Sequence, residues 1–144
     1  MSALPDNDDA IREILAQAKT IAIVGHSDRR DRVSYQVAQF LRNVGYIVYP
    51  VNPLICEIDS LPCYPALEKV PQPIDIVNIF RRSEYLPEIV DAAIAIRAKT
   101  IWGQLGIYHQ QSAKKAQDAG LNLVMDSCIK VEYLRLNVSQ NNSY

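Results

Sequence analysis

Short runs of apolar, mostly β-branched residues recur along the chain and are separated by longer segments of mixed polarity. The runs read TIAIVG, YIVYPV, IDIVNIF, KTIWGQ and LNLVMD and begin at residues 20, 46, 74, 99 and 121. Each run is apolar on both faces, whereas a half-exposed strand would alternate. This pattern is typical of parallel strands that are covered by helices on both sides. We therefore expect five buried parallel strands.

The segments between the runs carry apolar residues three and four positions apart, which indicates helices. Gly45 and Gly120 stand where two of these helices should end, and Pro87 fits the first turn of another. The stretch 54–73 holds four prolines and predicts a loop, with a small helix at about 66–69. The spacing predicts helices over about 7–18, 33–44, 83–98, 109–119 and 128–136.

Strand alternating with helix is the signature of an open α/β sheet. Because crossovers between parallel strands are right-handed, few topologies remain. We predict a three-layer Rossmann-like α/β domain whose five-stranded parallel sheet has the order 3-2-1-4-5, with helices on both faces. The whole chain, 1–144, is expected to form this one domain, with an ordered core over about 10–136 and a polar tail over 137–144.

Composition narrows the possible partners. Apolar residues make up 49% of the chain and charged residues 22%, as in an ordinary globular protein. The net charge of -1 argues against a general binder of nucleic acid or membrane surfaces. The start of the chain is acidic and unlike a secretion signal, and no apolar run approaches the ~20 residues of a membrane span. We expect a cytoplasmic protein.

The loop after the first strand, GHSDRRDR, has the features of an anion site. In an open α/β sheet, ligands bind beyond the carboxyl ends of the strands, where the strand order reverses, and the first strand lies at that point. Gly25 permits a sharp turn, and the following helix directs N–H groups and its dipole at the loop. The loop adds three arginines and several hydroxyl or carboxylate caps, namely Arg29, Arg30, Arg32, Ser27, Asp31 and Ser34. It predicts a phosphorylated ligand, the alternative being that the arginines are only solvated surface.

Common nucleotide motifs are absent. A dinucleotide site uses G-x-G-x-x-G and an acid at the end of the second strand, whereas this loop has one glycine and the second strand ends YPVNP. No Walker loop occurs either. Ordinary NAD, ATP and GTP binding are therefore disfavoured, and a nucleotide with an extra phosphate, which needs arginine, remains.

Several strand-end segments occur in an order found in one family. These are IAIVG, SYQVAQFL, GYIVYPVNP, CYPALEKVPQPIDIVNIFRR, IWGQLG and GLNLVMDSCIKVEY. Together they resemble the small stand-alone CoA-binding proteins, which are similar to the CoA-binding domain of the succinyl-CoA synthetase alpha subunit and of ADP-forming acyl-CoA synthetases. The resemblance covers about residues 10–136 and implies coenzyme A as the ligand.

The resemblance also implies a role for each strand end. The loop from Gly25 to Arg30 would take the CoA phosphates, with Ser27 and Ser34 as further donors. The second strand end would border the adenosine, the third would lie along nucleotide and pantetheine, and the fourth would shape the far side. The residues implied at these ends are Val51, Asn52 and Pro53, then Phe80, Arg81 and Arg82, then Gln104, Leu105 and Gly106. Relatives often carry a lysine after Asn–Pro, where this chain has Leu54.

Catalytic chemistry is not evident. His26 follows Gly25 and is placed where it could contact phosphate, but no partner for acid–base work can be named, and His109 is expected at the surface. No metal-ligand pattern stands out. We expect a binder of CoA or acyl-CoA without catalysis of its own. The alternative is a small Rossmann enzyme that uses a nicotinamide or another nucleotide.

Three cysteines indicate free thiols, because the count is odd. Cys56 and Cys63 are expected to be buried structural thiols. Cys128 begins a helix beside the site, where the dipole favours thiolate, so it is either a reactive thiol near the ligand or a small packing residue. The sequence leaves a homodimer or an unidentified protein partner open. Tyr64, Tyr108 and Tyr133 are candidates for a dimer face, and the equal alternative is that they are tyrosines scattered over the surface.

Overall fold

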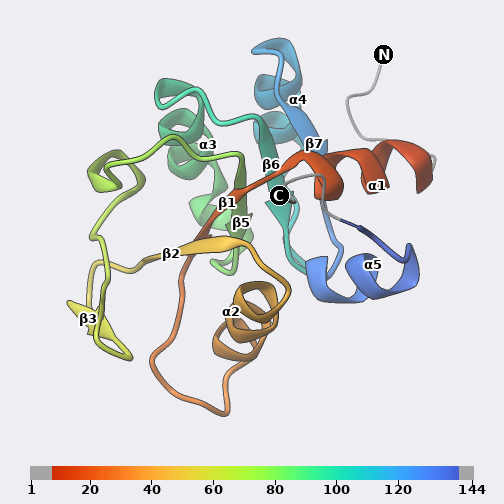
Figure 1. Cartoon of the computed structure of the whole chain (residues 1–144). Helices are drawn as coiled ribbons and strands as arrows, with labels where there is room; N and C mark the ends of the chain where they lie inside the picture. Colours follow the sequence, from red (N-terminus) through yellow and green to blue (C-terminus); the bar gives the residue numbers. More distant parts are fainter. Residues whose placement is uncertain (1–7, 140–144) are drawn as a thin grey trace.

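A computed structural model describes residues 8–139 of the chain. The main sheet contains five parallel strands, which are β1 (Thr20–Val24), β2 (Ile47–Val51), β5 (Ile76–Ile79), β6 (Thr100–Gly103) and β7 (Asn122–Val124) (Figure 1). All five correspond to the predicted apolar runs. The helices are α1 (Asp8–Gln17), α2 (Val33–Asn43), α3 (Leu86–Ala95), α4 (Gln110–Asp118) and α5 (Ile129–Arg135). Each falls within a predicted helix.

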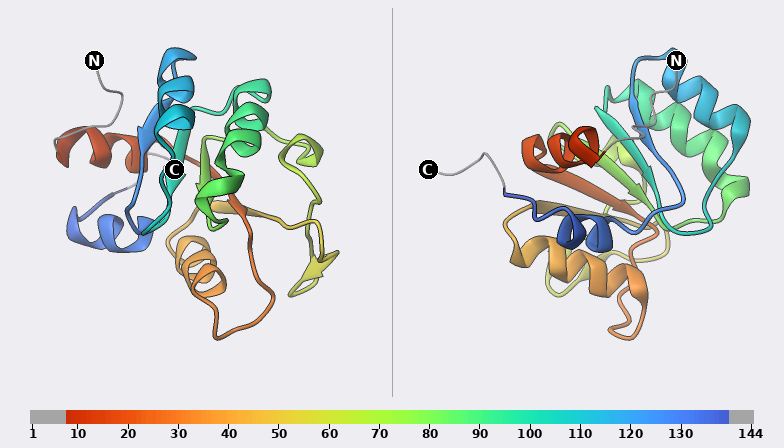
Figure 2. Two further views of the ribbon diagram at one scale, coloured as in Figure 1. Left: turned by 180° about the vertical axis from the view of Figure 1, so that it is seen from behind. Right: turned by 90° about the vertical axis from the view of Figure 1, so that its right-hand side faces the viewer.

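The helices form two layers, one on each face of the sheet (Figure 2). Alternate residues of β1 serve the two faces: Ala22 and Val24 pack on the side of α3 and α4, whereas Ile21 and Ile23 pack on the side of α1, α2 and α5. All these side chains are buried, as expected for a central strand. The three-layer α/β class is confirmed.

The strand order needs a correction. The observed order is β2-β1-β5-β6-β7, which is 2-1-3-4-5 in chain order and differs from the predicted 3-2-1-4-5. The third strand, β5, lies beside β1 and not outside β2. The point of reversal therefore lies between β1 and β5. Ligand sites form at such a point in this strand order as well.

Pro50 supplies the physical reason for this order. It is the fourth of the five residues of β2, and its carbonyl faces away from β1 and accepts a hydrogen bond from the Tyr64 N–H at 2.9 Å. N and C=O of one strand residue point the same way, so the missing N–H is also on the outer side. A proline confines its strand to the edge of a sheet. By contrast, all four residues of β5 are buried, which suits an interior strand.

The region between β2 and β5 is more structured than predicted. It contains the short hairpin of β3 (Glu57–Ile58) and β4 (Leu61–Pro62), where the sequence predicts only a loop. The predicted small helix is confirmed as a 3₁₀ turn, η1 (Leu67–Lys69). A second such turn, η2 (Ser83–Tyr85), precedes α3.

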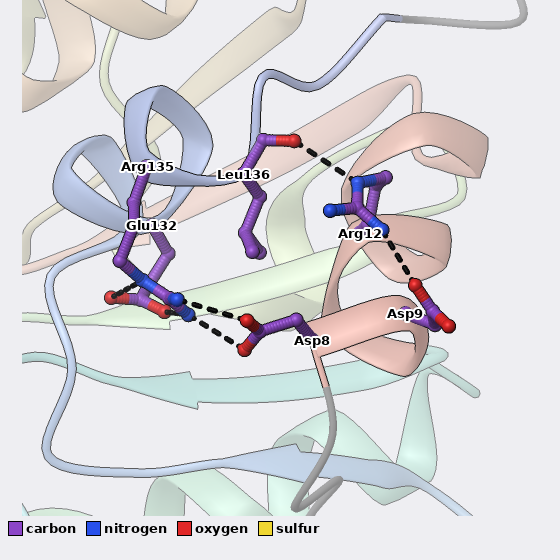
Figure 3. Close-up of polar contacts among 6 residues, drawn as sticks. All are labelled: Asp8, Asp9, Arg12, Glu132, Arg135 and Leu136. Carbon is purple, nitrogen blue, oxygen red and sulfur yellow. Dashed lines mark hydrogen bonds and ion pairs between the residues drawn. The ribbon is translucent and has the colours of Figure 1, made fainter.

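Ion pairs and a hydrogen bond join α1 to α5 on one face of the sheet (Figure 3). Arg135 contacts Asp8 at 2.9 Å and Glu132 at 2.7 Å, and Arg12 donates to the Leu136 carbonyl at 3.0 Å. The Arg135 guanidinium lowers the pKa of Asp8 through their hydrogen bond. Beyond α5, Val138 is buried, so packing continues into the segment predicted as a tail. Residues 1–7 and 140–144 lie outside the described range.

Within residues 8–139, no helix combines the length and apolar character needed to cross a bilayer. In the same range, no three His, Cys, Asp or Glu side chains are grouped so that they could hold a metal ion.

Candidate functional site

The loops that follow the strands meet at the carboxyl edge of the sheet. Backbone hydrogen bonds join them in strand order: Gly25 N–H donates to the Val51 carbonyl at 2.8 Å, and Phe80 N–H donates to the Val24 carbonyl at 2.8 Å. Gln104 N–H donates to the Ile79 carbonyl at 3.1 Å. The predicted strand-end residues are therefore brought together at one edge.

Gly25 makes the closest approach between two of these loops. Its φ is +90°, and a Cβ there would lie 3.1 Å from Arg81 Cδ and 3.3 Å from the backbone carbonyl of Phe80. Only glycine adopts this conformation at little cost and leaves room for the neighbouring loop. The structure thus explains the single glycine of the first loop by the position of β5.

Polar side chains hold the first loop in one conformation. Ser34 Oγ accepts from Ser27 N–H at 3.0 Å, and Ser27 Oγ accepts from Arg29 N–H at 3.0 Å. Asn52 donates from Nδ2 to the His26 carbonyl at 3.0 Å and accepts from Leu54 N–H at 2.9 Å. Both serines and Asn52 therefore use hydrogen-bonding groups of their side chains to hold the loop in its conformation.

The N terminus of α2 opens into this loop without a side-chain cap. Arg32 occupies the N-cap position and makes no capping hydrogen bond, and the first turn carries no acid. The first N–H groups of a helix have no intrahelical acceptors, so they point outward at the loop. Together with the helix dipole, they favour an anion here.

The three arginines of the loop differ in their partners. Arg29 pairs with Asp31 at 3.5 Å, and Arg30 approaches Asp59 of the β3–β4 turn at 3.9 Å. Arg32 is exposed and makes no ion pair with the described part of the chain. Its charge is thus the least compensated of the three, beside the uncapped helix.

Arg81 is held against Tyr85. Its guanidinium carbon lies 4.1 Å from the centre of the Tyr85 ring, a cation–π geometry, and its stem borders Gly25. Arg82 is exposed, and its guanidinium carbon is 6.0 Å from the same ring. Arg81 and Arg82 were predicted as site residues. Tyr85 was not, because the sequence only indicated that it belongs to a helix.

His26 is fully buried and does not reach the surface of the loop. Its Nδ1 lies 2.8 Å from the Ser27 carbonyl, so Nδ1 carries the proton, and Nε2 has no partner in the described structure. Burial lowers the pKa of His26 to about 4, which keeps the imidazole neutral. The structure therefore does not support a contact between this imidazole and phosphate. His26 contributes to the loop through its backbone carbonyl, which accepts from Asn52.

A pocket of about 380 Å³ opens beside Gly25, on the face covered by α3. Val51, Pro53 and Arg81, all predicted site residues, line it. Phe80 does not, because it packs against the cluster on the opposite face. The lining also includes residues that sequence reasoning missed, from the proline-rich segment and from α3: Pro65, Ala66, Leu67, Glu68, Glu88, Ile89 and Ala92. No local pattern marks them, since distant segments form the wall.

The far side of the edge is built around the loop after β6. Gly106 N–H donates to the Asp126 carboxylate at 2.6 Å, and Asp126 has a positive φ of 56°. Leu105 is exposed, and Gln104 is half-buried with Oε1 lacking a partner in the described structure. Asp126 was not predicted, although an aspartate two residues after a strand is a recognisable signal.

Of the three cysteines, Cys56 differs from the expectation. Cys128 is 9% exposed and packs in the cluster around Trp102, which is the packing role weighed for it. Cys63 is buried as predicted, but Cys56 is exposed, which corrects the prediction of a buried thiol. Cys56 lies outside the core because it precedes a two-stranded hairpin that the sequence did not reveal.

The remaining candidates are separated in space. His109 caps α4 by accepting from Ser112 N–H and is half-buried. Tyr133 packs edge-on against Phe40 and Tyr46, with ring centres 5.5 and 6.0 Å apart, so it belongs to the packing of the α1–α2–α5 face.

Comparison with known proteins adds to this geometry. The model of a family described as "CoA binding domain" matches residues 19–134. An uncharacterized protein of Bacillus subtilis, YneT, is 40% identical over 123 residues, which cover 85% of this chain and 91% of that protein. An ADP-forming acetate–CoA ligase of Archaeoglobus fulgidus is 34% identical over 79 residues, which cover 55% of this chain but 12% of the ligase.

Two solved structures are also similar. A hypothetical protein of Pyrococcus horikoshii is 39% identical, with a TM-score of 0.89 over 91% of this chain and 92% of that chain. A protein of Thermus thermophilus is 36% identical, with a TM-score of 0.87 over 90% and 98%. Both therefore match nearly the whole fold.

Proposed function

Because the chain belongs to the CoA-binding domain family, we propose that it binds coenzyme A or an acyl-CoA at the carboxyl edge of its sheet and catalyses no reaction of its own. The curated ligase relative is far longer, and the matched segment is 12% of it. Binding is thus the activity that the shared segment supports.

One observation carries the proposal: the loop that begins at Gly25 leads into the uncapped N terminus of α2 with the unpaired Arg32, and Val24 and Arg81, which adjoin Gly25, line a pocket. The N–H groups of α2 and the Arg32 guanidinium suit the phosphates of CoA. Arg81 lies between this loop and the pocket and can serve either the phosphates or the nucleoside. The second strand end then borders the adenosine.

The pocket beside Gly25 suits a purine. It combines apolar walls, from Val51, Pro53 and Ile89, with the carboxylates of Glu68 and Glu88. A carboxylate accepts hydrogen bonds from an exocyclic amino group such as that of adenine. The pantetheine arm would then run toward the loop after β6, past Gln104 and Gly106.

A dinucleotide fits this site less well. Asn52 stands at the end of β2, where a ribose-binding acid would be, and its amide already holds the His26 carbonyl and Leu54 N–H. We therefore expect NAD to bind at least tenfold more weakly than CoA. This comparison also separates CoA binding from the alternative of a small nicotinamide-dependent enzyme.

Isothermal titration calorimetry with CoA, dephospho-CoA and NAD tests the proposal. A charge-assisted contact contributes about 1.5–3 kcal/mol, so Arg32→Ala and Arg81→Ala should each weaken CoA binding by roughly tenfold or more. Lys99→Ala is the matched control, because it removes one positive charge next to the start of β6, at the opposite edge of the sheet. It should change the affinity less than twofold.

Dephospho-CoA separates the roles of the arginines. An arginine that serves the 3′-phosphate loses its effect with dephospho-CoA, whereas one that serves the pyrophosphate keeps it. Arg29 and Arg30 already approach carboxylates. Replacing either with alanine should therefore reduce the CoA affinity less than Arg32→Ala does. Equal affinity for NAD and CoA, or unchanged CoA binding after both arginine changes, would refute the proposal.

A cytoplasmic location stays a prediction from the sequence, as does a homodimer or an unidentified protein partner. Light scattering of the purified protein with and without CoA would test the homodimer.

A further inference from the structure

Cys56 and Cys63 face each other across the β3–β4 hairpin. The register pairs Ile58 with Leu61 and Glu57 with Pro62, so the next pair is Cys56 with Cys63. The Cys63 N–H donates to the Cys56 carbonyl at 2.9 Å, which confirms that the pairing continues to this position. Asp59 and Ser60, with φ of 51° and 69°, form the two-residue turn that sets this register.

This position brings the two thiols within reach of a bond. Directly opposed residues in an antiparallel pair have Cα atoms about 4.5–5.5 Å apart and side chains on the same face. Disulfides span Cα separations of about 4.4–6.8 Å. Cys56 lies in a bend just before β3, so it can shift toward Cys63 without breaking the strand pairs.

The two thiols differ in accessibility. Cys56 is exposed, whereas Cys63 is buried, with Sγ 3.8 Å from the Asn52 carbonyl oxygen. Burial, and secondarily the nearby Cys56 thiol, raise the pKa of Cys63. An oxidant therefore meets Cys56 first, and Cys63 is placed to react second.

We propose that Cys56 and Cys63 form a redox-active dithiol that reduces a small-molecule disulfide and closes into an intrachain disulfide. The Cys56 thiolate attacks the disulfide RSSR, forming a mixed disulfide and releasing one RS⁻. The Cys63 thiolate then attacks the Cys56 sulfur and releases the second RS⁻. The protons of the two cysteines end on the two released thiols, so two RSH form for each RSSR reduced.

The site is separate from the proposed CoA contacts but adjoins them. Cys63 touches the Asn52 backbone, and the hairpin turn reaches α2 through the hydrogen bond from Tyr35 to Asp59. The dithiol itself does not depend on CoA binding, and its test uses no CoA.

Oxidised glutathione and mass spectrometry of the intact, folded protein test the proposal. The expected product has lost the mass of two hydrogens and carries no glutathione. No Lys or Arg lies between Arg42 and Lys69, so trypsin leaves both cysteines in one peptide, 43–69. Additional cleavage after Glu57 should give two fragments, 43–57 and a second that begins at Ile58, that stay joined until a reductant is added.

Single variants separate the two steps. Cys63→Ser should stop at a glutathione adduct on Cys56, and Cys56→Ser should block both steps. Cys128→Ser is the matched control and should close the disulfide like the parent, because Cys128 lies in a different part of the fold. A parent protein that retains the Cys56 adduct as Cys63→Ser does, or a disulfide that includes Cys128 or a second chain, would overturn the proposal.

Discussion

Replacing Gly25 with alanine tests whether the first loop and the β5 loop are built as one site. The added methyl meets two obstacles: a backbone with φ of +90°, and atoms of Arg81 and Phe80 at 3.1 and 3.3 Å. The Phe80 backbone is fixed by its hydrogen bond to the Val24 carbonyl, so Arg81 or the loop itself must move.

The two obstacles contribute separate costs. A non-glycine residue in a left-handed conformation costs about 1–2 kcal/mol. Overpacking a site that cannot relax typically adds about 1–3 kcal/mol. Together these costs should lower the free energy of unfolding of Gly25→Ala by about 2–5 kcal/mol. Displacement of Arg81 should also weaken CoA binding by roughly tenfold, the effect of one charge-assisted contact.

Gly120→Ala is the control that measures the cost of the left-handed backbone conformation alone. Gly120 has nearly the same φ, +87°, but no described atom lies within 4 Å of its Cβ position. It precedes β7, at the edge of the sheet remote from the site. Urea unfolding should therefore show a loss of only about 1–2 kcal/mol, with unchanged CoA affinity by calorimetry.

The difference in stability and CoA affinity between Gly25→Ala and Gly120→Ala decides whether the close approach of the two loops matters. If Gly25→Ala is no less stable than Gly120→Ala and binds CoA as well as the parent, the close approach of the two loops has no energetic consequence. The loop after β1 and the loop after β5 would then not act as one site.

Three further outcomes follow from individual residues. Because the pKa of His26 is lowered from 6.5 to about 4 in the folded state, the unfolded chain binds the extra proton first, and stability should fall as the pH drops from about 6.5 to 4. The loss should reach about 3 kcal/mol in urea unfolding, and an NMR pKa near 6.5 for this ring would contradict the prediction. Arg97 has a φ of 60° after the end of α3, so Arg97→Gly should raise the free energy of unfolding by about 0.5–1 kcal/mol; a loss of stability in urea would count against it. A maleimide should label exposed Cys56 faster than Cys63 or Cys128, and labelling of all three at one rate would show that the buried thiols are accessible.

The periodicity of apolar residues predicted the helices and strands well. Runs such as TIAIVG and IDIVNIF are apolar on both faces because both faces are covered, and this property is local. The loop after β1 could also be placed at the reversal of strand order, since that inference needs only the order of elements and right-handed crossovers. The element types were thus predictable, and the loop that the sequence singled out is the one on which the proposed site is built.

The order of the strands in the sheet could be predicted from the sequence only in part. Pro50 marks β2 as an edge strand, and that signal was present in the sequence. The predicted order nevertheless has the third strand outside β2. Pairing between strands far apart in the chain depends on which surfaces each must bury, so a local pattern constrains it weakly.

Only the tertiary structure decided which side chains of the predicted loop are buried and which hold the loop together. His26, Ser27 and Ser34 stand in the predicted loop, yet the imidazole is buried and the hydroxyls hold the loop together. The Cys56–Cys63 pair likewise depends on a hairpin whose strands have two residues each, too short to show any period. Side-chain direction depends on contacts with distant segments, and these contacts exist only once the chain has packed.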